Sequence, residues 1–348
     1  MSMMRFFTNK KISFLAVFFL CALGCSSPQR DPRHRYRESA LLMGTTVQID
    51  VCYTEGEEDK LQKAYQQVWA RLEEVSARMS VFDPASEISR INESNGEPLE
   101  VPADIYELIQ ESIRLNKLTA GAFDITVGPL IELWRKSAQR DVYPGEEELK
   151  IARKSVGVAH IELLGQNRVR VSRGVKIDLG GIAKGYAVDE AARLLRGNNF
   201  TDFLIDAGGD LYISGRNREY QPWLIGIKHP RQVSQVIDRI RVKDAAITTS
   251  GDYERFLEIQ GQKWSHIINP ITGYPQRGVV SATVIAPDAA TADALSTALC
   301  VWDAQKGLSL IDSLGDSFAA MIIVCFDDLS IIKYESRQYR RLKQKSAN

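Results

Sequence analysis

The sequence predicts an α+β fold, in which strands occur in runs and do not alternate regularly with helices. A strand and two amphipathic helices are expected in the first part of the chain, and a run of strand-like segments follows in the middle. A strand, a helix and a final strand are expected near the end. A doubly wound parallel sheet would alternate strands and helices throughout, so that architecture is not favoured.

The spacing of apolar residues places these elements. Alternation over 46–51 predicts a strand, and apolar residues three and four apart over 57–79 predict an amphipathic helix. A second helix is expected over 102–118, and a short one after residue 150. Later strands are expected over 168–177, 203–205, 211–214, 223–228, 279–286 and 319–326, and later helices over 188–195 and 292–302.

Composition and charge limit the classes of function. The 348 residues are 44% hydrophobic and 25% charged, which suits one large globular domain or two small ones. The 44 basic residues balance the 44 acidic ones. No global positive charge therefore indicates a nucleic acid partner, and any anion must be bound by a local site.

Residues 1–24 have the pattern of a signal peptide. Basic residues precede an apolar run over 12–23, and this run is too short to span a bilayer, which needs about 20 residues. It ends in Ala-Leu-Gly-Cys, which resembles a lipoprotein box with Cys25 as the lipidated residue, although leucine is commoner at the position of Ala22. We expect an exported protein, lipid-anchored to the bacterial cell membrane on the periplasmic side. A plain secretory signal is the alternative.

The segment 25–40 is rich in Arg, Pro and Ser and lacks apolar periodicity, so it predicts an unfolded tether before a domain over 41–340. Three cysteines follow the tether, Cys52, Cys300 and Cys325. They have no CxxC spacing and no histidine partner, which favours buried thiols over a disulfide framework or a metal site.

The segment 178–185 reads Asp-Leu-Gly-Gly-Ile-Ala-Lys-Gly, between an expected strand and an expected helix. A tight turn at such a place presents unpaired backbone N–H groups and the positive end of a helix, which suits a phosphate or pyrophosphate with Lys184 as counter-charge. The glycine spacing matches neither the dinucleotide-binding pattern nor a P-loop. Ordinary turn chemistry is the alternative interpretation.

Asp293, Ser296 and Thr297 are expected close together on a helix, since Asp293 and Thr297 are four residues apart. A carboxylate and hydroxyls are hard oxygen ligands suited to Mg²⁺, which takes few protein ligands and keeps water or phosphate for the rest. The alternative is a surface helix with common polar residues.

His266 begins the segment His-Ile-Ile-Asn-Pro-Ile-Thr-Gly, where a strand-like piece runs into a turn. A histidine there can accept a proton near neutral pH, and none of His34, His160 and His229 lies in a comparably dense motif. A capping or core histidine is the alternative.

Two earlier segments, 79–92 and 121–130, each begin where a helix is expected to end, and their Phe82 and Phe123 belong either to the core or to a surface that packs on a planar ring.

Taken in order, all these segments resemble the flavin transferase family called ApbE, the FAD:protein FMN transferases. The resemblance covers roughly 41–325. Its pieces are Met43-Gly-Thr, 79–92, Gly121-Ala-Phe-Asp, 178–185, Asp206-Ala-Gly-Gly-Asp, Ser250-Gly-Asp-Tyr, His266-Ile-Ile-Asn-Pro and Ala292-Asp-Ala-Leu-Ser-Thr.

This resemblance implies a T-fold-like α+β fold of two lobes, with FAD in the cleft between them and Mg²⁺ near the pyrophosphate. Asp293 and Thr297 correspond to metal ligands, Ser296 stands where other members can offer a carboxylate, and the Gly181 carbonyl is a further ligand. Asn269 and Ile271 depart from the usual Asp and Arg, which weakens any role for Asn269. The positions that contact FAD in the family are here Met43, Phe82, Ala122, Phe123, Asp124, Asp178, Lys184 and Ile267.

The resemblance also implies the reaction. A Thr or Ser hydroxyl of an acceptor protein attacks the FMN phosphorus of FAD and AMP leaves, with Mg²⁺ stabilising charge and His266 as the candidate base. The implied acceptors are membrane-associated flavoprotein subunits, such as those of the sodium-pumping NADH:quinone reductase. Two alternatives stay open: an FAD pyrophosphatase that forms FMN and AMP, and a non-catalytic flavin-binding lipoprotein.

Overall fold

The computed structural model describes residues 33–232, 234–253, 256–326 and 330–347, so the predicted signal peptide and Cys25 lie outside the described residues. The helices are α1 (Glu58–Met79), α2 (Glu87–Asn92), α3 (Ala103–Leu118), α4 (Gly128–Arg140), α5 (Glu146–Lys154), α6 (Ala183–Gly197), α7 (Ala289–Val301), α8 (Ala304–Ser313) and α9 (Arg337–Ala347). The strands are β1 (His34–Leu42), β2 (Thr45–Tyr53), β3 (Leu99–Glu100), β4 (Ile161–Leu163), β5 (Arg168–Val171), β6 (Phe203–Ala207), β7 (Asp210–Ser214), β8 (Trp223–Lys228), β9 (Val236–Val242), β10 (Ala245–Gly251), β11 (Phe256–Ile259), β12 (Gln262–Ser265), β13 (Val279–Ala286), β14 (Ala319–Cys325) and β15 (Ile331–Glu335).

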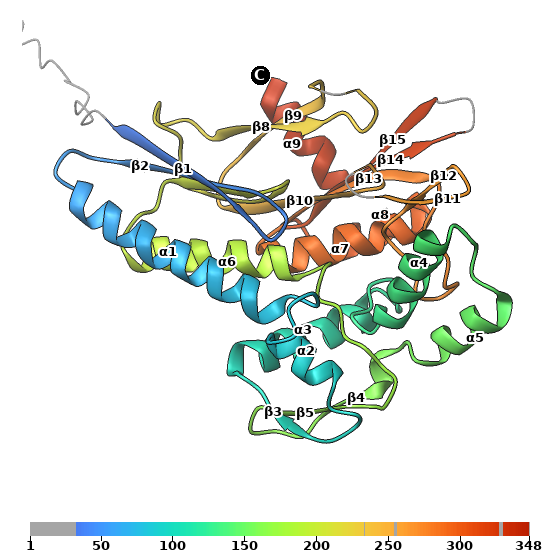
Figure 1. The fold of residues 1–348 in the computed structure, drawn as a ribbon. Coiled ribbons are helices and arrows are strands. Elements are labelled where there is room, and N and C mark those ends of the chain that lie inside the picture. Colours follow the sequence, from blue (N-terminus) through green and yellow to red (C-terminus); the bar gives the residue numbers. More distant parts are fainter. Residues whose placement is uncertain (1–32, 233, 254–255, 327–329, 348) are drawn as a thin grey trace, which may run out of the picture. The chain divides into compact units, whose positions relative to one another are not determined.

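An eight-stranded sheet, ordered β1-β2-β6-β7-β10-β13-β14-β15, organises the folded unit, and its neighbouring strands are antiparallel. Every residue of β13 is buried, so both faces of the sheet must be covered at this strand. Helices α1, α6 and α7 lie along one face, whereas β8, β9 and α9 lie over the other (Figure 1). On that second face, Ile213 and Ile247 of the sheet pack with Trp223 of β8 and Tyr339 of α9.

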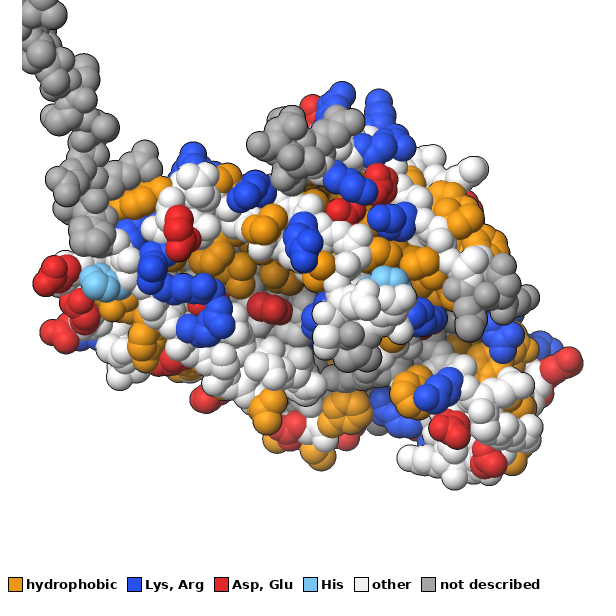
Figure 2. Space-filling model, turned by 90° about the horizontal axis from the view of Figure 1, so that it is seen from above, with side chains coloured by type: hydrophobic (Ala, Val, Ile, Leu, Met, Phe, Trp, Pro, Cys, Tyr) orange, Lys and Arg blue, Asp and Glu red, His pale blue; other side chains and the backbone are white. Residues whose placement is uncertain are grey.

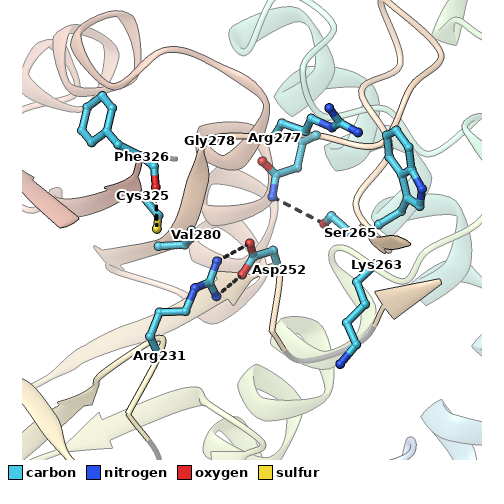
Figure 3. A pocket seen from close by; sticks show the side chains of 11 residues that line it. Arg231, Asp252, Lys263, Ser265, Arg277, Gly278, Val280, Cys325 and Phe326 are labelled. Carbon is cyan, nitrogen blue, oxygen red and sulfur yellow. Dashed lines mark hydrogen bonds and ion pairs between the residues drawn. The ribbon is translucent and has the colours of Figure 1, made fainter. Parts of the chain in front are cut away.

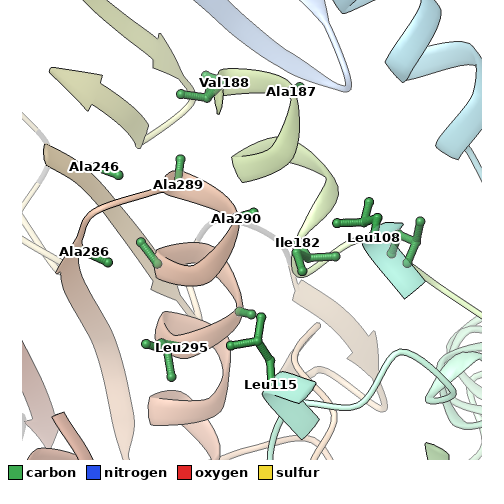
Figure 4. Close-up of a cluster of buried hydrophobic side chains, with 14 of the residues drawn as sticks. Leu108, Leu115, Ile182, Ala187, Val188, Ala246, Ala286, Ala289, Ala290 and Leu295 are labelled. Carbon is green, nitrogen blue, oxygen red and sulfur yellow. The ribbon is translucent and has the colours of Figure 1, made fainter. Parts of the chain in front are cut away.

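Helices α6 and α7 approach each other closely on the first face. A Cβ atom on Gly185 of α6 would overlap the carbonyl oxygen of Ala289, so only glycine allows this contact. Asp189 accepts hydrogen bonds from the N–H groups of Ala289 and Ala290, both at 2.8 Å, and thereby caps α7 from the neighbouring helix. Leu115 of α3 packs beside them in the main core (Figure 4). The start of α7 is therefore held rigidly.

A second group of elements, α2 to α5 with the small sheet β3-β5-β4, lies on the side of these helices away from the large sheet (Figure 1). Its α4 and α5 share a separate cluster of buried residues with β11, formed around Leu130, Trp134, Leu149 and Ile259. The α+β prediction is confirmed, because helices and antiparallel strands occur in separate runs.

The predicted tether is wrong over its last part. The folded unit begins at Arg33 and not at residue 41, because β1 pairs with β2 along its whole length. As an edge strand, β1 does not need an apolar face; its charged side chains form ion pairs instead. Arg35 and Arg37 both bind the buried carboxylate of Asp50, at 2.7 and 2.8 Å.

Other boundaries differ less. The strand predicted over 168–177 ends at Val171, and α9 continues past the predicted domain end at residue 340. Cys52 and Cys300 are buried as predicted, whereas Cys325 is only half-buried. Within the described part of the chain, the helices are too short or too polar for a membrane span.

Candidate functional site

The glycine-rich segment 178–185 follows the second group of elements, α2 to α5 with β3-β5-β4, and leads into α6. The Asp178 N–H donates to the Ile125 carbonyl at 2.7 Å, and the Gly180 N–H donates to the Asp178 carboxylate at 2.8 Å. Burial raises the pKa of Asp178, which the Gly180 N–H and the positive charge of Arg135 oppose. The turn thus holds a carboxylate that lacks a full countercharge.

Helix α7 presents Asp293 beside the first turn of α6. The Asp293 carboxylate is 2% exposed and accepts a hydrogen bond from the Gly185 N–H at 3.2 Å. Lys184 lies 4.0 Å from Asp293 and is also ion-paired with the buried Asp210. Burial raises the pKa of Asp293, and the nearby Lys184 ammonium lowers it in part. Two buried carboxylates therefore share one lysine.

The hydroxyls of α7 complete this cluster. The Ser250 hydroxyl lies 2.7 Å from the Ser296 hydroxyl and 3.4 Å from that of Thr297. Gly181 lies so close that an added Cβ atom would be 3.2 Å from the Thr297 hydroxyl and 3.4 Å from the ring of Phe123. The structure thus brings three separate segments to one place, and we call Asp178, Gly181, Lys184, Asp293 and Thr297 the acidic centre.

The segment Gly121-Ala-Phe-Asp lines this centre from the side of α3. The Asn116 side chain donates to the Phe123 carbonyl at 2.7 Å and to the Asp124 carboxylate at 3.0 Å. Thr126 gives Asp124 two further hydrogen bonds, from its N–H and its hydroxyl. Burial nevertheless raises the pKa of Asp124. Ala122 and Phe123 are buried, so Phe123 is a core residue as well as a neighbour of Gly181.

Met43 and Phe82 lie at more exposed positions. Met43 has a φ of 51° at the tip of the β1–β2 hairpin, and the next residue but one, Thr45, touches Gly208 in the β6–β7 turn. Phe82 is 70% exposed, with the Arg135 guanidinium 4.9 Å from its ring centroid. Phe82 is therefore not a core residue: Arg135 lies over its ring, and the rest of the exposed ring can contact a planar ligand.

His266 is half-buried and directly follows β12. The adjoining Ile267 N–H donates to the Ser265 hydroxyl at 3.1 Å, and the Ile267 carbonyl accepts from the Gln276 N–H at 2.9 Å. The turn after it is fixed to α4, because the Trp134 indole N–H donates to the Gly273 carbonyl at 2.8 Å. His266 thus occupies a braced position between two packed segments.

Asn269 has a structural role that the sequence left in doubt. Its side-chain oxygen accepts hydrogen bonds from the N–H groups of Ile271 and Thr272, at 2.9 and 3.2 Å. A carboxylate would accept the same two bonds, so asparagine preserves the turn that the usual aspartate would form. Ile271 is 49% exposed, and its departure from arginine leaves the core unaffected.

Sequence reasoning assigned no role to Asp210, Ser250 or Asp189. The structure places Asp210 against Lys184, Ser250 against the α7 hydroxyls, and Asp189 at the start of α7. The first two lie inside segments already singled out, which was the available signal. Asp189 gave none, since its contacts with Ala289 and Ala290 bridge residues about a hundred positions apart.

With this geometry in place, comparison with known proteins is informative. The sequence model of the ApbE family matches residues 43–322. The chain belongs to the ApbE family. ApbE relatives named FAD:protein FMN transferase are 36% identical over 322 residues in Vibrio cholerae and 33% identical over 309 residues in Haemophilus influenzae. These matches cover 90% and 86% of this chain, and 93% and 89% of the two relatives.

Solved ApbE structures share the fold. The ApbE protein of Thermotoga maritima superposes with a TM-score of 0.80 at 36% identity, covering 89% of this chain and 99% of that one. The flavin transferase ApbE of Vibrio cholerae also gives a TM-score of 0.80, at 34% identity, covering 89% of this chain and 100% of that one. The fold predicted from the ApbE resemblance is confirmed.

Proposed function

We propose that this protein is an FAD:protein FMN transferase, which moves the FMN half of FAD onto a Thr or Ser hydroxyl of an acceptor protein and releases AMP. The observation that carries the proposal is the convergence of Gly181, Phe123 and Thr297 within contact distance. Three segments distant in sequence meet there, and the relatives with the same family pattern are named for this reaction.

FAD would lie across the acidic centre and the neighbouring Gly121-Ala-Phe-Asp segment. The exposed ring of Phe82 and the hairpin residue Met43 offer surfaces for a planar flavin, and the positive end of the α6 dipole faces a pyrophosphate bound at the start of that helix. Lys184 supplies a positive charge at that helix start. Ala122, Phe123, Asp124, Asp178 and Ile267 would complete the contacts.

The oxygen atoms at the acidic centre fit a hard divalent cation such as Mg²⁺. Asp293 is a buried carboxylate whose nearest cation is Lys184, and Ser296 and Thr297 add hydroxyls beside the Gly181 backbone. Since His, Cys, Asp and Glu form no group of three in the described residues, such a site would use hydroxyl and carbonyl oxygens as well. When bound, Mg²⁺ would offset negative charge on the phosphate oxygens.

The transfer forms one bond and breaks another. The acceptor hydroxyl oxygen bonds to the FMN phosphorus, the pyrophosphate P–O bond breaks, and AMP leaves with the bridging oxygen. His266 would take the hydroxyl proton, because a free Thr or Ser hydroxyl is a poor nucleophile near neutral pH. Its braced position after β12 would hold the imidazole in place while the acceptor approaches.

We further propose that the protein is exported and lipid-anchored through Cys25 on the periplasmic side of the cell membrane, where it would meet acceptor subunits of membrane electron-transport complexes. The apolar run and the Ala-Leu-Gly-Cys sequence support this proposal. Cys25→Ser should release the protein from the membrane fraction and abolish palmitate labelling. A variant that stays membrane-bound and labelled would contradict the assignment.

The function is tested by incubating the purified protein with FAD, Mg²⁺ and the flavin-carrying subunit of a sodium-pumping NADH:quinone reductase. Mass spectrometry should find FMN attached to the subunit, with AMP released in equal amount. An acceptor whose flavinylated threonine is replaced by valine is the control. Formation of free FMN and AMP without attachment would instead show a pyrophosphatase, and tight FAD binding without AMP would show a flavin-binding protein.

A further inference from the structure

A polar cavity of about 190 Å³ is lined by Ser265, the residue before His266, and lies apart from the residues assigned to FAD and metal (Figure 3). It is bounded by β12, by the chain leading into β13, and by the ends of β10 and β14. Ser265, immediately before His266, lines it, and so does Gln276, which is hydrogen-bonded to Ile267 just after. Whatever occupies the cavity would therefore lie close to the backbone on either side of the proposed base.

The cavity has more positive than negative side chains. Arg231, Lys263 and Arg277 line it, against the single carboxylate of Asp252 among the described lining residues. Arg231 is neutralised by Asp252 through two hydrogen bonds of 2.8 and 2.7 Å. Lys263 and Arg277 contact aromatic rings instead: the ammonium lies 4.3 Å from the Phe256 centroid and the guanidinium 4.0 Å from that of Trp264. These two cations can bind an incoming carboxylate.

Gln276 adds an unpaired hydrogen-bond acceptor to the residues that line the cavity. Its side chain is 6% exposed, and its Nε2 donates to the Val279 carbonyl at 3.0 Å and to the Ser265 hydroxyl at 3.4 Å. A carbonyl only accepts, so the amide orientation is fixed and Oε1 is the atom without a partner. A buried, unpaired acceptor costs about 1–3 kcal/mol, which a ligand N–H would recover.

We propose that this cavity docks an acidic segment of the acceptor protein beside the hydroxyl that is flavinylated. A peptide supplies both features at once, since its main chain offers N–H donors to Gln276 and its Asp or Glu side chains offer carboxylates to Lys263 and Arg277. A small anion would satisfy only the cations. The proposal rests on the proposed function, because it assumes that the partner brings a Thr or Ser hydroxyl to His266.

The surface around the cavity agrees with a protein partner. The face that carries β8 and β9 shows Lys and Arg side chains in several groups, with hydrophobic side chains between them (Figure 2). Phe326, at the rim of the cavity, is 45% exposed, and Phe256 beside Lys263 is 49% exposed. Aromatic and arginine side chains are enriched at protein interfaces.

The test uses synthetic peptides of one length with a central threonine flanked by Asp, by Asn or by Lys, and measures their binding to the purified full chain by fluorescence anisotropy. The Asp peptide should bind about tenfold more tightly than the Asn peptide, and the Lys peptide most weakly. Succinate, which has carboxylates and no N–H, should compete poorly. Equal binding of the three peptides would overturn the proposal.

Two matched charge-reversal variants test whether the preference for the Asp peptide depends on this cavity. Lys263→Glu should remove the preference for the Asp peptide, whereas Lys306→Glu should not, although Lys306 of α8 also lies over an aromatic ring, 4.2 Å from the centroid of Trp302. Thermal denaturation confirms that both variants fold. Equal loss of peptide binding in the two variants would refute the docking site.

Steady-state flavinylation of the acceptor subunit separates this proposal from the proposed function. Lys263→Glu should raise the KM for acceptor about tenfold, far more than it lowers kcat, with the FAD dissociation constant close to that of the wild type. An unchanged KM would count against docking at the cavity. If the wild type prefers the Asp peptide yet attaches no flavin to any acceptor, the proposed function fails while the docking site stands.

Discussion

The acidic centre and the cavity lined by Ser265 handle charge in opposite ways. At the acidic centre, Asp178 and Asp293 are carboxylates whose pKa values burial raises, with Lys184 as the nearest cation of Asp293. In the cavity, the Lys263 ammonium lies over the Phe256 ring and the Arg277 guanidinium lies over the Trp264 ring. Each region has an excess of one charge, which is unfavourable when no ligand is bound. The sign of that excess predicts a ligand of the opposite charge. This difference supports the proposed cation at the first region and the proposed acidic peptide at the second.

The largest effect is expected at the acidic centre. Asp293→Ala should lower turnover by about 1,000-fold or more, because it removes the one carboxylate that the proposed metal site takes from α7. AMP release measured over a range of Mg²⁺ concentrations checks this. Asp288→Ala is the control, since it removes only the helix cap that binds the Thr291 N–H. Full activity of Asp293→Ala at low micromolar Mg²⁺ would move the metal elsewhere.

His266→Ala should slow flavinylation by about 100- to 10,000-fold, the usual contribution of a general base. The FAD dissociation constant should change much less, because His266 acts on the acceptor hydroxyl. Activity per FAD-loaded molecule is the decisive measurement. If thermal stability and FAD affinity fall together while that activity stays near normal, His266 only supports the turn before Asn269.

Ser250→Ala should raise the Mg²⁺ concentration needed for half-maximal activity by about tenfold or more, as removal of a group that orients metal ligands does. Its hydroxyl contacts both Ser296 and Thr297 and is absent from the proposed ligand set. Saturating Mg²⁺ should restore kcat. An unchanged Mg²⁺ requirement would mean that the α7 hydroxyls are oriented without Ser250.

Gly185→Ala should lower stability by about 1–3 kcal/mol, because the added methyl group forces α6 away from the Ala289 backbone. Gly197→Ala is the matched control in the same helix: it has open space around it and should stabilise the protein slightly through helix propensity. Thermal denaturation compares the two. Equal melting temperatures would show that the contact between α6 and α7 can relax freely.

The last expected effect is on stability as a function of pH. Burial raises the pKa of Asp189 from its ordinary 3.8 to about 7, against the two N–H groups of α7. Between these pH values Asp189 is ionised in the unfolded chain and protonated in the folded protein. The free energy of unfolding therefore falls as the pH rises from about 4 to 7. Relative to Asp189→Asn, the wild type should melt at a lower temperature at pH 8 than at pH 5. The opposite trend would show that the N–H groups outweigh burial.

Local patterns predicted the interior better than the edges. The strands expected over 223–228 and 279–286 coincide with β8 and β13, because buried strands must be apolar where they pack. The edge strand β1 was missed, since its stability comes from pairing with β2 and from Asp50, which local periodicity does not show.

The residues of the candidate site show the same contrast between local sequence patterns and contacts between distant elements. The sequence singled out Asp178, Lys184, Asp293 and Thr297 through their segments, and the structure places Lys184 beside Asp293 and places Gly181, three residues after Asp178, beside Thr297. Asp189 and the cavity partners Lys263 and Gln276 could not be recognised, because their roles depend on contacts between distant elements and on an acceptor atom left without a partner.

The early start of β1 also limits how far from the membrane surface a lipid-anchored form of this protein could act. With Cys25 as the lipid attachment point, residues 26–32 alone connect the bilayer surface to the folded unit, where the predicted tether would have ended at residue 40. A fully extended chain of that length spans about 25 Å, roughly half of what the longer tether would allow. If the protein is anchored through Cys25 as proposed, it would reach only those acceptors whose flavin-bearing segment stays near the membrane surface.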